Sequence, residues 1–175
     1  MRVKVNEKGA AAGDLGDCDA AYLAATADMA LKAPDRAAIK QYLAKGGFLW
    51  IEAVGGRRAA EEAVKTLARD AGWELTPLAK DEALIVGRFA KAHGYDLSSG
   101  VRYGRALRIA RISSQYAELS GIHQDGKLVG IYSPFDVVFS TTGYAAYGCR
   151  GYEPEDALAV ATNIILYLTD RNTTK

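Results

Sequence analysis

The chain has 175 residues, two cysteines, two histidines and a net charge of +1. This length predicts one domain, residues 1–175, with a sizeable core. The near-neutral charge gives no global attraction to nucleic acid or to an anionic membrane. No apolar run approaches 18 residues, and the isolated cysteines and histidines match no metal spacing. We therefore expect no nucleic-acid partner, no membrane span in this chain and no cofactor.

The N-terminal half alternates predicted strands and helices. The expected elements are a short strand at Val3–Val5, a strand at 19–27, a helix from Pro34 to Gly46, a strand at 48–54, a helix over 60–71 that ends at Gly72, and a strand at 73–78. The run at 19–27 is continuous and apolar, the pattern of a strand buried on both faces. This alternation is typical of an α/β fold with a mainly parallel sheet.

The C-terminal half is less regular. The segment "LIVGRFA" fits a strand or a short helix, and residues 119–133 predict a β-hairpin that turns at Asp125–Gly126. A last helix is predicted from Pro154, with Glu155 and Asp156 favouring its start. Four arginines stand three apart, at positions 102, 105, 108 and 111. They would form a basic stripe on a helix, and we favour a solvated face paired with acidic side chains over a phosphate contact.

Three loops are expected to meet at the carboxyl ends of the strands, where open α/β sheets bind ligands. They are 26–34, 52–58 and 133–153. The candidate ligand-binding residues in them are Glu52, Arg57, Ser133, Asp136, Arg150 and Tyr152. Each has a simpler interpretation: Ser133 and Asp136 are ordinary turn formers, Arg150 could pair with Glu153, and the tyrosines 144, 147 and 152 could cover the core or pave a contact surface.

The turn "EAVGGRR" could hold an anion on backbone N–H groups with the help of Arg57, but we favour glycines that only make the turn. It also resembles a nucleophile elbow, whose apex needs Ser or Cys, and here the apex is Val54–Gly55. Cys149 is a second nucleophile candidate. It needs a neighbouring base, and nothing in the sequence ties His93 or His123 to it, so we favour a packed thiol.

Three stretches carry a resemblance to a known family: "KGGFLWIEA", "GIHQDGKLVGIYSPFD" and "CRGYEPEDALAVATNIILYLT". In this order they resemble the bacterial DUF4159 domain family. The resemblance implies a three-layer α/β/α fold, flavodoxin-like and similar to class I glutamine amidotransferases, with no established activity. This chain departs from the complete fold, because we expect it to lack the first βα unit. Family members are often exported or joined to membrane-anchored regions, which suggests an extracytoplasmic domain and leaves a cytoplasmic one open.

Three functions remain open. The first is a non-catalytic domain on an amidotransferase-like scaffold that binds a small molecule or a protein partner. The second is a hydrolase or transferase that uses Cys149 or Ser133 as its nucleophile. The third, with less support, is an oligomerisation module that pairs copies through an open strand edge.

Overall fold

A computed structural model describes Leu15 and residues 18–110, 116–144 and 146–172. Its elements in chain order are β1 (Ala20–Ala25), α1 (Ala33–Ala44), β2 (Phe48–Ala53), η2 (Val54–Gly56), α2 (Arg58–Ala71), β3 (Glu74–Pro77), α3 (Ala83–Val86), α4 (Arg105–Ala110), β4 (Ser120–Gln124), β5 (Lys127–Ser133), η3 (Phe139–Thr142) and α5 (Pro154–Asn172). The strand expected at Val3–Val5 lies outside these described residues.

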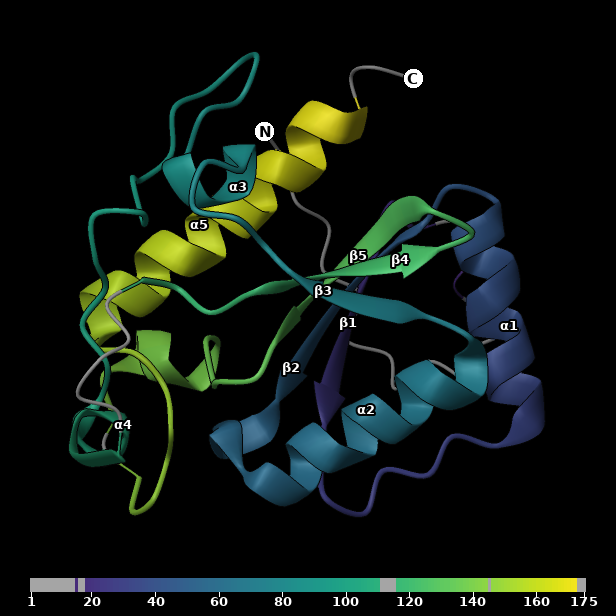
Figure 1. Ribbon diagram of the computed structural model, residues 1–175, viewed down its shortest axis with the longest axis horizontal. Helices are drawn as coiled ribbons and strands as arrows, with labels where there is room; N and C mark the ends of the chain where they lie inside the picture. Colours follow the sequence, from purple (N-terminus) through teal and green to yellow (C-terminus); the bar gives the residue numbers. More distant parts are fainter. Residues whose placement is uncertain (1–14, 16–17, 111–115, 145, 173–175) are drawn as a thin grey trace.

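The described strands form one five-stranded sheet in the order β1-β2-β5-β4-β3 (Figure 1). The pairs β1–β2 and β2–β5 are parallel, whereas β4 runs antiparallel to both β5 and β3. Four of the five described strands therefore point the same way, and β4 alone is reversed. The short link from β4 to β5 passes through Asp125 and Gly126, both with positive φ.

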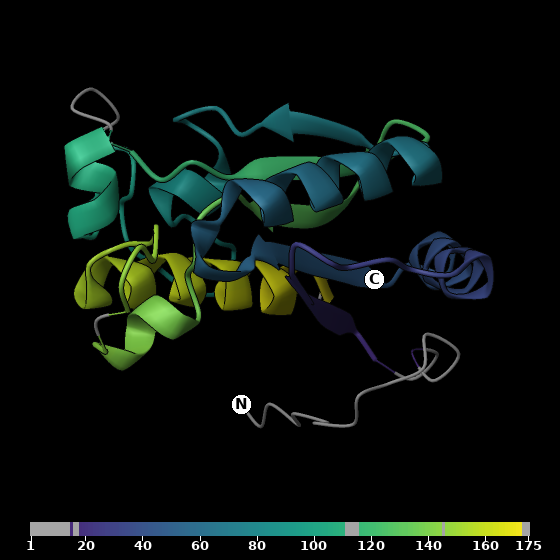
Figure 2. The ribbon, with the colours of Figure 1, turned by 90° about the horizontal axis from the view of Figure 1, so that it is seen from below.

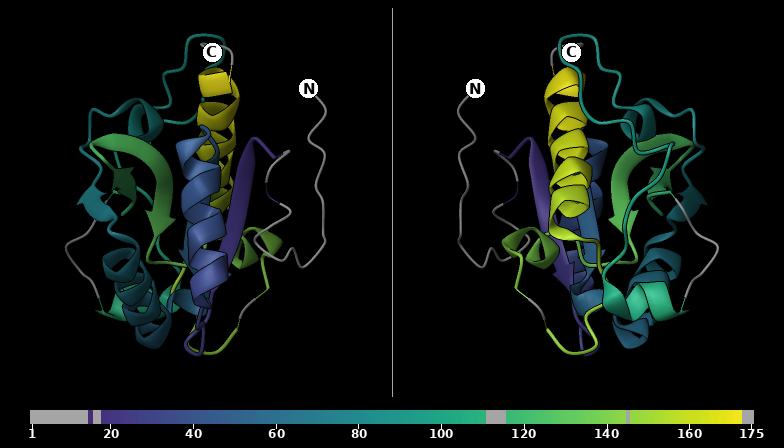
Figure 3. Two further views of the ribbon diagram at one scale, coloured as in Figure 1. Left: turned by 90° about the vertical axis from the view of Figure 1, so that its right-hand side faces the viewer. Right: turned by 90° about the vertical axis from the view of Figure 1, so that its left-hand side faces the viewer.

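Alternate side chains of β2 enter two separate cores, one on each face of the sheet. Phe48 and Trp50 pack with α3, α4 and α5, and Leu49 and Ile51 pack with α1 and α2. The two views in Figure 3 place α1 in front of the sheet in one and α5 in the other. All six residues of β2 are buried, as the apolar run at 48–54 predicted.

The expectation that the strand at 19–27 is buried on both faces is wrong. β1 is an edge strand whose described residues pair only with β2, at the end of the sheet opposite β3 (Figure 2). Tyr22 is 46% exposed, and its ring packs edge-on against that of Trp50 with the ring centroids 5.2 Å apart. Small apolar residues satisfy an edge strand as well as a central one, so the composition of the run could not distinguish the two positions.

The helix boundaries follow the predicted signals. α1 has Pro34 in its first turn, α2 ends at Gly72 in the left-handed conformation, and α5 begins at Pro154. The ambiguous segment "LIVGRFA" contributes to the short helix α3. In the described part of the chain, no helix is both long enough and apolar enough to cross a bilayer.

The arginine series is divided rather than aligned on one helix. Arg102 precedes α4 and bonds to Glu155 (2.6 Å) and Asp156 (2.8 Å) at the start of α5, and Arg108 lies 3.5 Å from Glu153. The arginine of each pair is well exposed, so each pair adds little stability. Arg111 lies outside the described residues. Two of the arginines are thus paired with acidic side chains, which is the interpretation favoured from the sequence.

Candidate functional site: a cavity at the strand ends

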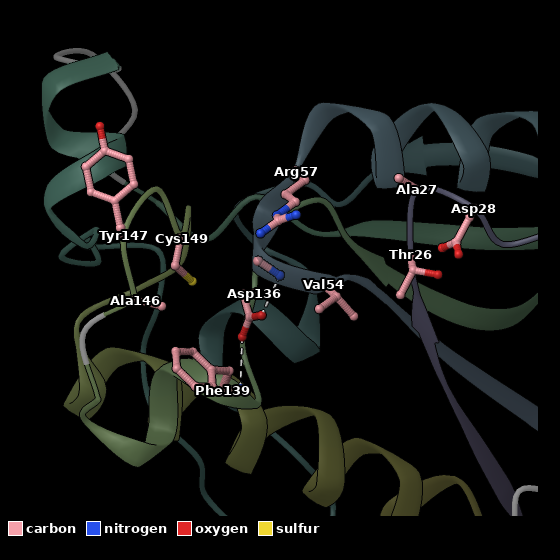
Figure 4. Close-up of a pocket in the computed structure, with 11 residues that line it drawn as sticks. Thr26, Ala27, Asp28, Val54, Arg57, Asp136, Phe139, Ala146, Tyr147 and Cys149 are labelled. Carbon is pink, nitrogen blue, oxygen red and sulfur yellow. Dashed lines mark hydrogen bonds between the residues drawn. The ribbon is translucent and has the colours of Figure 1, made fainter.

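A cavity of about 490 Å³ lies beyond the carboxyl ends of β1 and β2 (Figure 4). All three loops that were expected to meet contribute to its lining. The lining residues are Thr26, Ala27 and Asp28 from the first loop, Val54, Gly55 and Arg57 from the second, and Asp136, Phe139, Ala146, Tyr147 and Cys149 from the third. The volume lies within the range of small-molecule sites.

Asp136 joins two of these loops by accepting backbone hydrogen bonds. Its Oδ2 accepts from the N–H of Gly55 at 2.7 Å, and its Oδ1 accepts from Phe139 at 2.9 Å and from Ser140 at 3.3 Å. The side chain is almost completely buried. A buried carboxylate needs such partners to offset its desolvation, so Asp136 mainly holds the turn after β2 against η3.

Glu52 lies beneath the same loop. It is the buried penultimate residue of β2, and its carboxylate accepts hydrogen bonds from Val137 at 3.3 Å and Val138 at 3.2 Å. Burial, together with the nearby charge of Asp136, raises the pKa of Glu52 to about 7, and hydrogen bonds from Tyr22 and the loop backbone oppose this rise. Glu52 therefore titrates near neutral pH while it holds the backbone of the loop after β5.

The glycine turn is required by close packing of the backbone. Gly55 and Gly56 have φ values of 64° and 58°. The N–H of Arg150 donates to the carbonyl of Gly55 at 2.9 Å, and that of Asp136 donates to the carbonyl of Arg150 at 3.1 Å. A Cβ on Gly56 would overlap the carbonyl oxygen of Arg150. These glycines therefore serve turn geometry and close approach, which agrees with the simpler interpretation favoured from the sequence.

The six candidate ligand-binding residues lie at different depths. Arg57 and Asp136 line the cavity, whereas Glu52 is buried and does not line it. Ser133 is fully buried, and its hydroxyl donates to the carbonyl of Phe135 at 2.6 Å. Neither Ser133, Arg150 nor Tyr152 is among the residues that line the cavity.

Two details of the third loop decide between interpretations that the sequence left open. Tyr152 is buried and stacks on Tyr103 with ring centroids 5.1 Å apart, so it belongs to the core and does not pave the loop surface. Arg150 lies over the ring of Phe135, at 5.6 Å from its centroid, whereas Glu153 pairs with Arg108. The expected Arg150–Glu153 pair is therefore wrong, because each side chain finds a different neighbour.

Cys149 is the nucleophile candidate that lines the cavity, but its surroundings disfavour the reactive thiolate form. Burial raises the pKa of Cys149 to about 11, with Asp136 and Glu52 adding to the rise and Arg57 opposing it. A thiol with this pKa is almost entirely protonated at neutral pH. Neither histidine lines the cavity. His123 lies on β4 and pairs with Glu74 of β3, and the backbone of His93 forms an isolated antiparallel β-bridge with that of Arg88.

The sequence reasoning missed several cavity residues. Asp28 and Thr26 follow β1, and Phe139 begins η3. The first loop was expected at the site, but no signal singled out its side chains, because Asp and Thr are common after any strand. Among the described residues, no three His, Cys, Asp or Glu side chains come close enough to hold a metal ion.

A family model described as "Domain of unknown function (DUF4159)" matches residues 6–169. This chain belongs to the DUF4159 family. The match covers every described strand and the loops of the cavity, so the site of this DUF4159 domain lies wholly inside the family region. A comparison with curated proteins gives no match.

Proposed function

We propose that this DUF4159 domain is a non-catalytic binding domain that holds a small molecule in the cavity at the ends of β1 and β2. The observation that carries the proposal is the lining of the cavity. Exposed Arg57 lies there beside a backbone frame, the turn after β2 and η3, which the hydrogen bonds of Asp136 hold together. The scaffold we propose is flavodoxin-like and similar to class I glutamine amidotransferases. The sequence motifs and the mainly parallel strand directions support this assignment.

Arg57 is the side chain best placed to contact a ligand. It directly precedes α2, lines the cavity and is exposed. Among the described residues, its guanidinium makes no ion pair and no hydrogen bond. An anionic group there would meet both Arg57 and the positive end of the α2 dipole.

The frame around Arg57 favours binding over catalysis. The hydrogen bonds of Asp136 tie η3 to the turn after β2, so the cavity walls are positioned before a ligand arrives, which lowers the ordering cost of binding. The alternative, a hydrolase or transferase that uses Cys149 or Ser133, has less support. The raised pKa of Cys149 and the burial of Ser133 leave neither as a ready nucleophile.

The experiment is a small-molecule screen read by thermal shift and confirmed by calorimetry. Wild type is compared with Arg57→Ala and with Arg58→Ala, a matched control because Arg58 is an exposed neighbour that does not line the cavity. We expect compounds that bind wild type and Arg58→Ala and bind Arg57→Ala more weakly. Equal affinities for Arg57→Ala and Arg58→Ala would place the binding site elsewhere and refute the proposal.

A second function, homo-oligomerisation through β1, has one observation in its favour. β1 is an edge strand with the uncharged sequence "AAYLAA", and such a strand lacks the charges and prolines that prevent edge pairing. A lysine at the exposed Ala24 should then dissociate any oligomer. Light scattering over a range of concentrations tests this, and a wild-type protein that stays monomeric at every concentration excludes it.

A further inference from the structure

Two charged side chains of opposite sign line the cavity without pairing with each other. Arg57 comes from the loop after β2, and Asp28 comes from the loop after β1 (Figure 4). Asp28 is fully solvated and accepts a hydrogen bond from Thr26, which lowers its pKa. It is therefore ionised at neutral pH, and no lysine, arginine or histidine of the described residues pairs with it.

The third charged side chain that lines the cavity, Asp136, is already hydrogen-bonded within the protein. Both oxygens of Asp136 accept backbone hydrogen bonds, from Gly55 on one side and from Phe139 and Ser140 on the other. This carboxylate is committed to the fold. The charges left for a ligand are thus one cation, Arg57, and one anion, Asp28.

The rest of the cavity lining is mainly apolar. Val54, Phe139 and the alanines 27 and 146 contribute to the lining, and the exposed ring of Tyr147 completes it. An aromatic ring can attract an ammonium group through its face. A ligand complementary to this lining has an apolar body, an anionic group for Arg57 and a cationic group for Asp28.

We infer that the ligand class of this cavity is a small zwitterion, such as an amino acid, whose carboxylate meets Arg57 and whose ammonium group meets Asp28. The inference rests on the proposed function and specifies its ligand. A ligand with one charge would leave either Arg57 or Asp28 without a partner. The charges on both walls therefore favour a zwitterion over a simple anion such as phosphate or a fatty acid.

Five-carbon compounds that differ in their charged groups test the inference: norvaline and 5-aminopentanoate as zwitterions, pentanoate as the anion and pentylamine as the cation. Affinities are measured by calorimetry or by titration of amide chemical shifts. We expect at least one zwitterion to bind more tightly than both singly charged compounds. Because exposed ion pairs contribute up to about 1 kcal/mol, loss of each charge should weaken binding by about threefold to fivefold.

Two variants assign the charges. Arg57→Ala should weaken the zwitterion and pentanoate but not pentylamine, and Asp28→Asn should weaken the zwitterion and pentylamine but not pentanoate. The controls are Arg58→Ala and Asp70→Asn, which change exposed residues that do not line the cavity. These controls should leave all four affinities unchanged.

The possible failures are distinguishable. If pentanoate binds as tightly as both zwitterions and depends on Arg57, the proposed binding function stands and the zwitterion inference is overturned. The same holds if Asp28→Asn leaves zwitterion binding unchanged. If no compound of this set or of the broad screen binds in a way that depends on Arg57, both the function and the inference are overturned.

Discussion

Glu52 and Asp136 are two buried carboxylates that bind consecutive N–H groups of one loop. Glu52 accepts from Val137 and Val138, and Asp136 accepts from Phe139 and Ser140 while it also reaches across to Gly55. The loop after β5 is thus attached to the end of β2 through side-chain acceptors. Two like charges this close would repel, and the proximity contributes to the raised pKa of Glu52.

The stability of the domain should depend on pH through Glu52. Its folded-state pKa of about 7 exceeds the ordinary value of 4.5, so the folded state binds this proton more tightly than the unfolded state. The stabilisation of the folded state by the protonated Glu52 is complete below about pH 4.5 and is lost as the pH rises through about 7. We therefore expect Glu52→Gln, which is neutral at every pH, to become more stable relative to wild type by about 3 kcal/mol between pH 4.5 and about pH 8.

Urea unfolding at several pH values measures this difference. Glu74→Gln, a change at an exposed glutamate of β3, controls for the general effect of removing a carboxyl group. A difference between Glu52→Gln and wild type that stays constant with pH would show that Glu52 has an ordinary pKa.

Removal of the Asp136 carboxylate should destabilise the fold strongly. Asp136→Ala leaves three backbone N–H groups without their acceptor, and the loss of such charged hydrogen bonds should cost about 3 kcal/mol or more. Asp136→Asn keeps one acceptor oxygen and should cost less. Thermal or urea unfolding checks the order, with exposed Asp70→Ala as the control. Equal stability of Asp136→Ala and the control would contradict the bonding described.

A glycine pair separates conformational strain from steric overlap. Gly56 and Gly72 both have positive φ, at 58° and 70°. A Cβ at Gly72 would have no heavy atom within 4 Å, whereas a Cβ at Gly56 would overlap the backbone of Arg150. Gly72→Ala should therefore cost about 1 kcal/mol for the left-handed conformation alone. Gly56→Ala should cost at least about 1 kcal/mol more, and equal losses in unfolding experiments would contradict the close approach.

Cys149 should react slowly with alkylating reagents in the folded protein. Because its pKa is about 11, the thiolate fraction at about pH 8 is smaller than for an ordinary cysteine. Iodoacetamide labelling, followed by peptide mass spectrometry, should show a lower rate for Cys149 in folded than in urea-unfolded protein, rising steeply with pH. Faster labelling in the folded protein would indicate an activated thiol and would revive the hydrolase or transferase alternative.

Local signals were enough to predict most elements, but not which contacts the side chains make. Pro34, Gly72 and Pro154 mark helix ends through backbone geometry, which acts within a few residues. The exposure of Tyr22 could not be predicted, since it depends on the position of β1 at the sheet edge. The burial of Tyr152 depends likewise on packing against Tyr103.

The site was predicted at the level of loops and less well at the level of residues. The rule that strand ends meet at one edge brought all three loops to the cavity. The sequence could not predict that Asp136 would hold the loops while Arg57 stays available to a ligand. This difference depends on which side chain accepts the backbone N–H hydrogen bonds. Asp28 was missed because its significance comes only from lining the same cavity as Arg57.

The most direct test of the binding proposal is a map of backbone amide chemical shifts during titration with the tightest compound of the screen. We predict that the perturbed amides cluster in the three cavity loops, around residues 26–28, 54–57 and 136–149, in wild type and in Arg58→Ala. The perturbations should become much weaker at the same concentration in Arg57→Ala. Perturbations centred elsewhere, or unchanged in Arg57→Ala, would contradict the account.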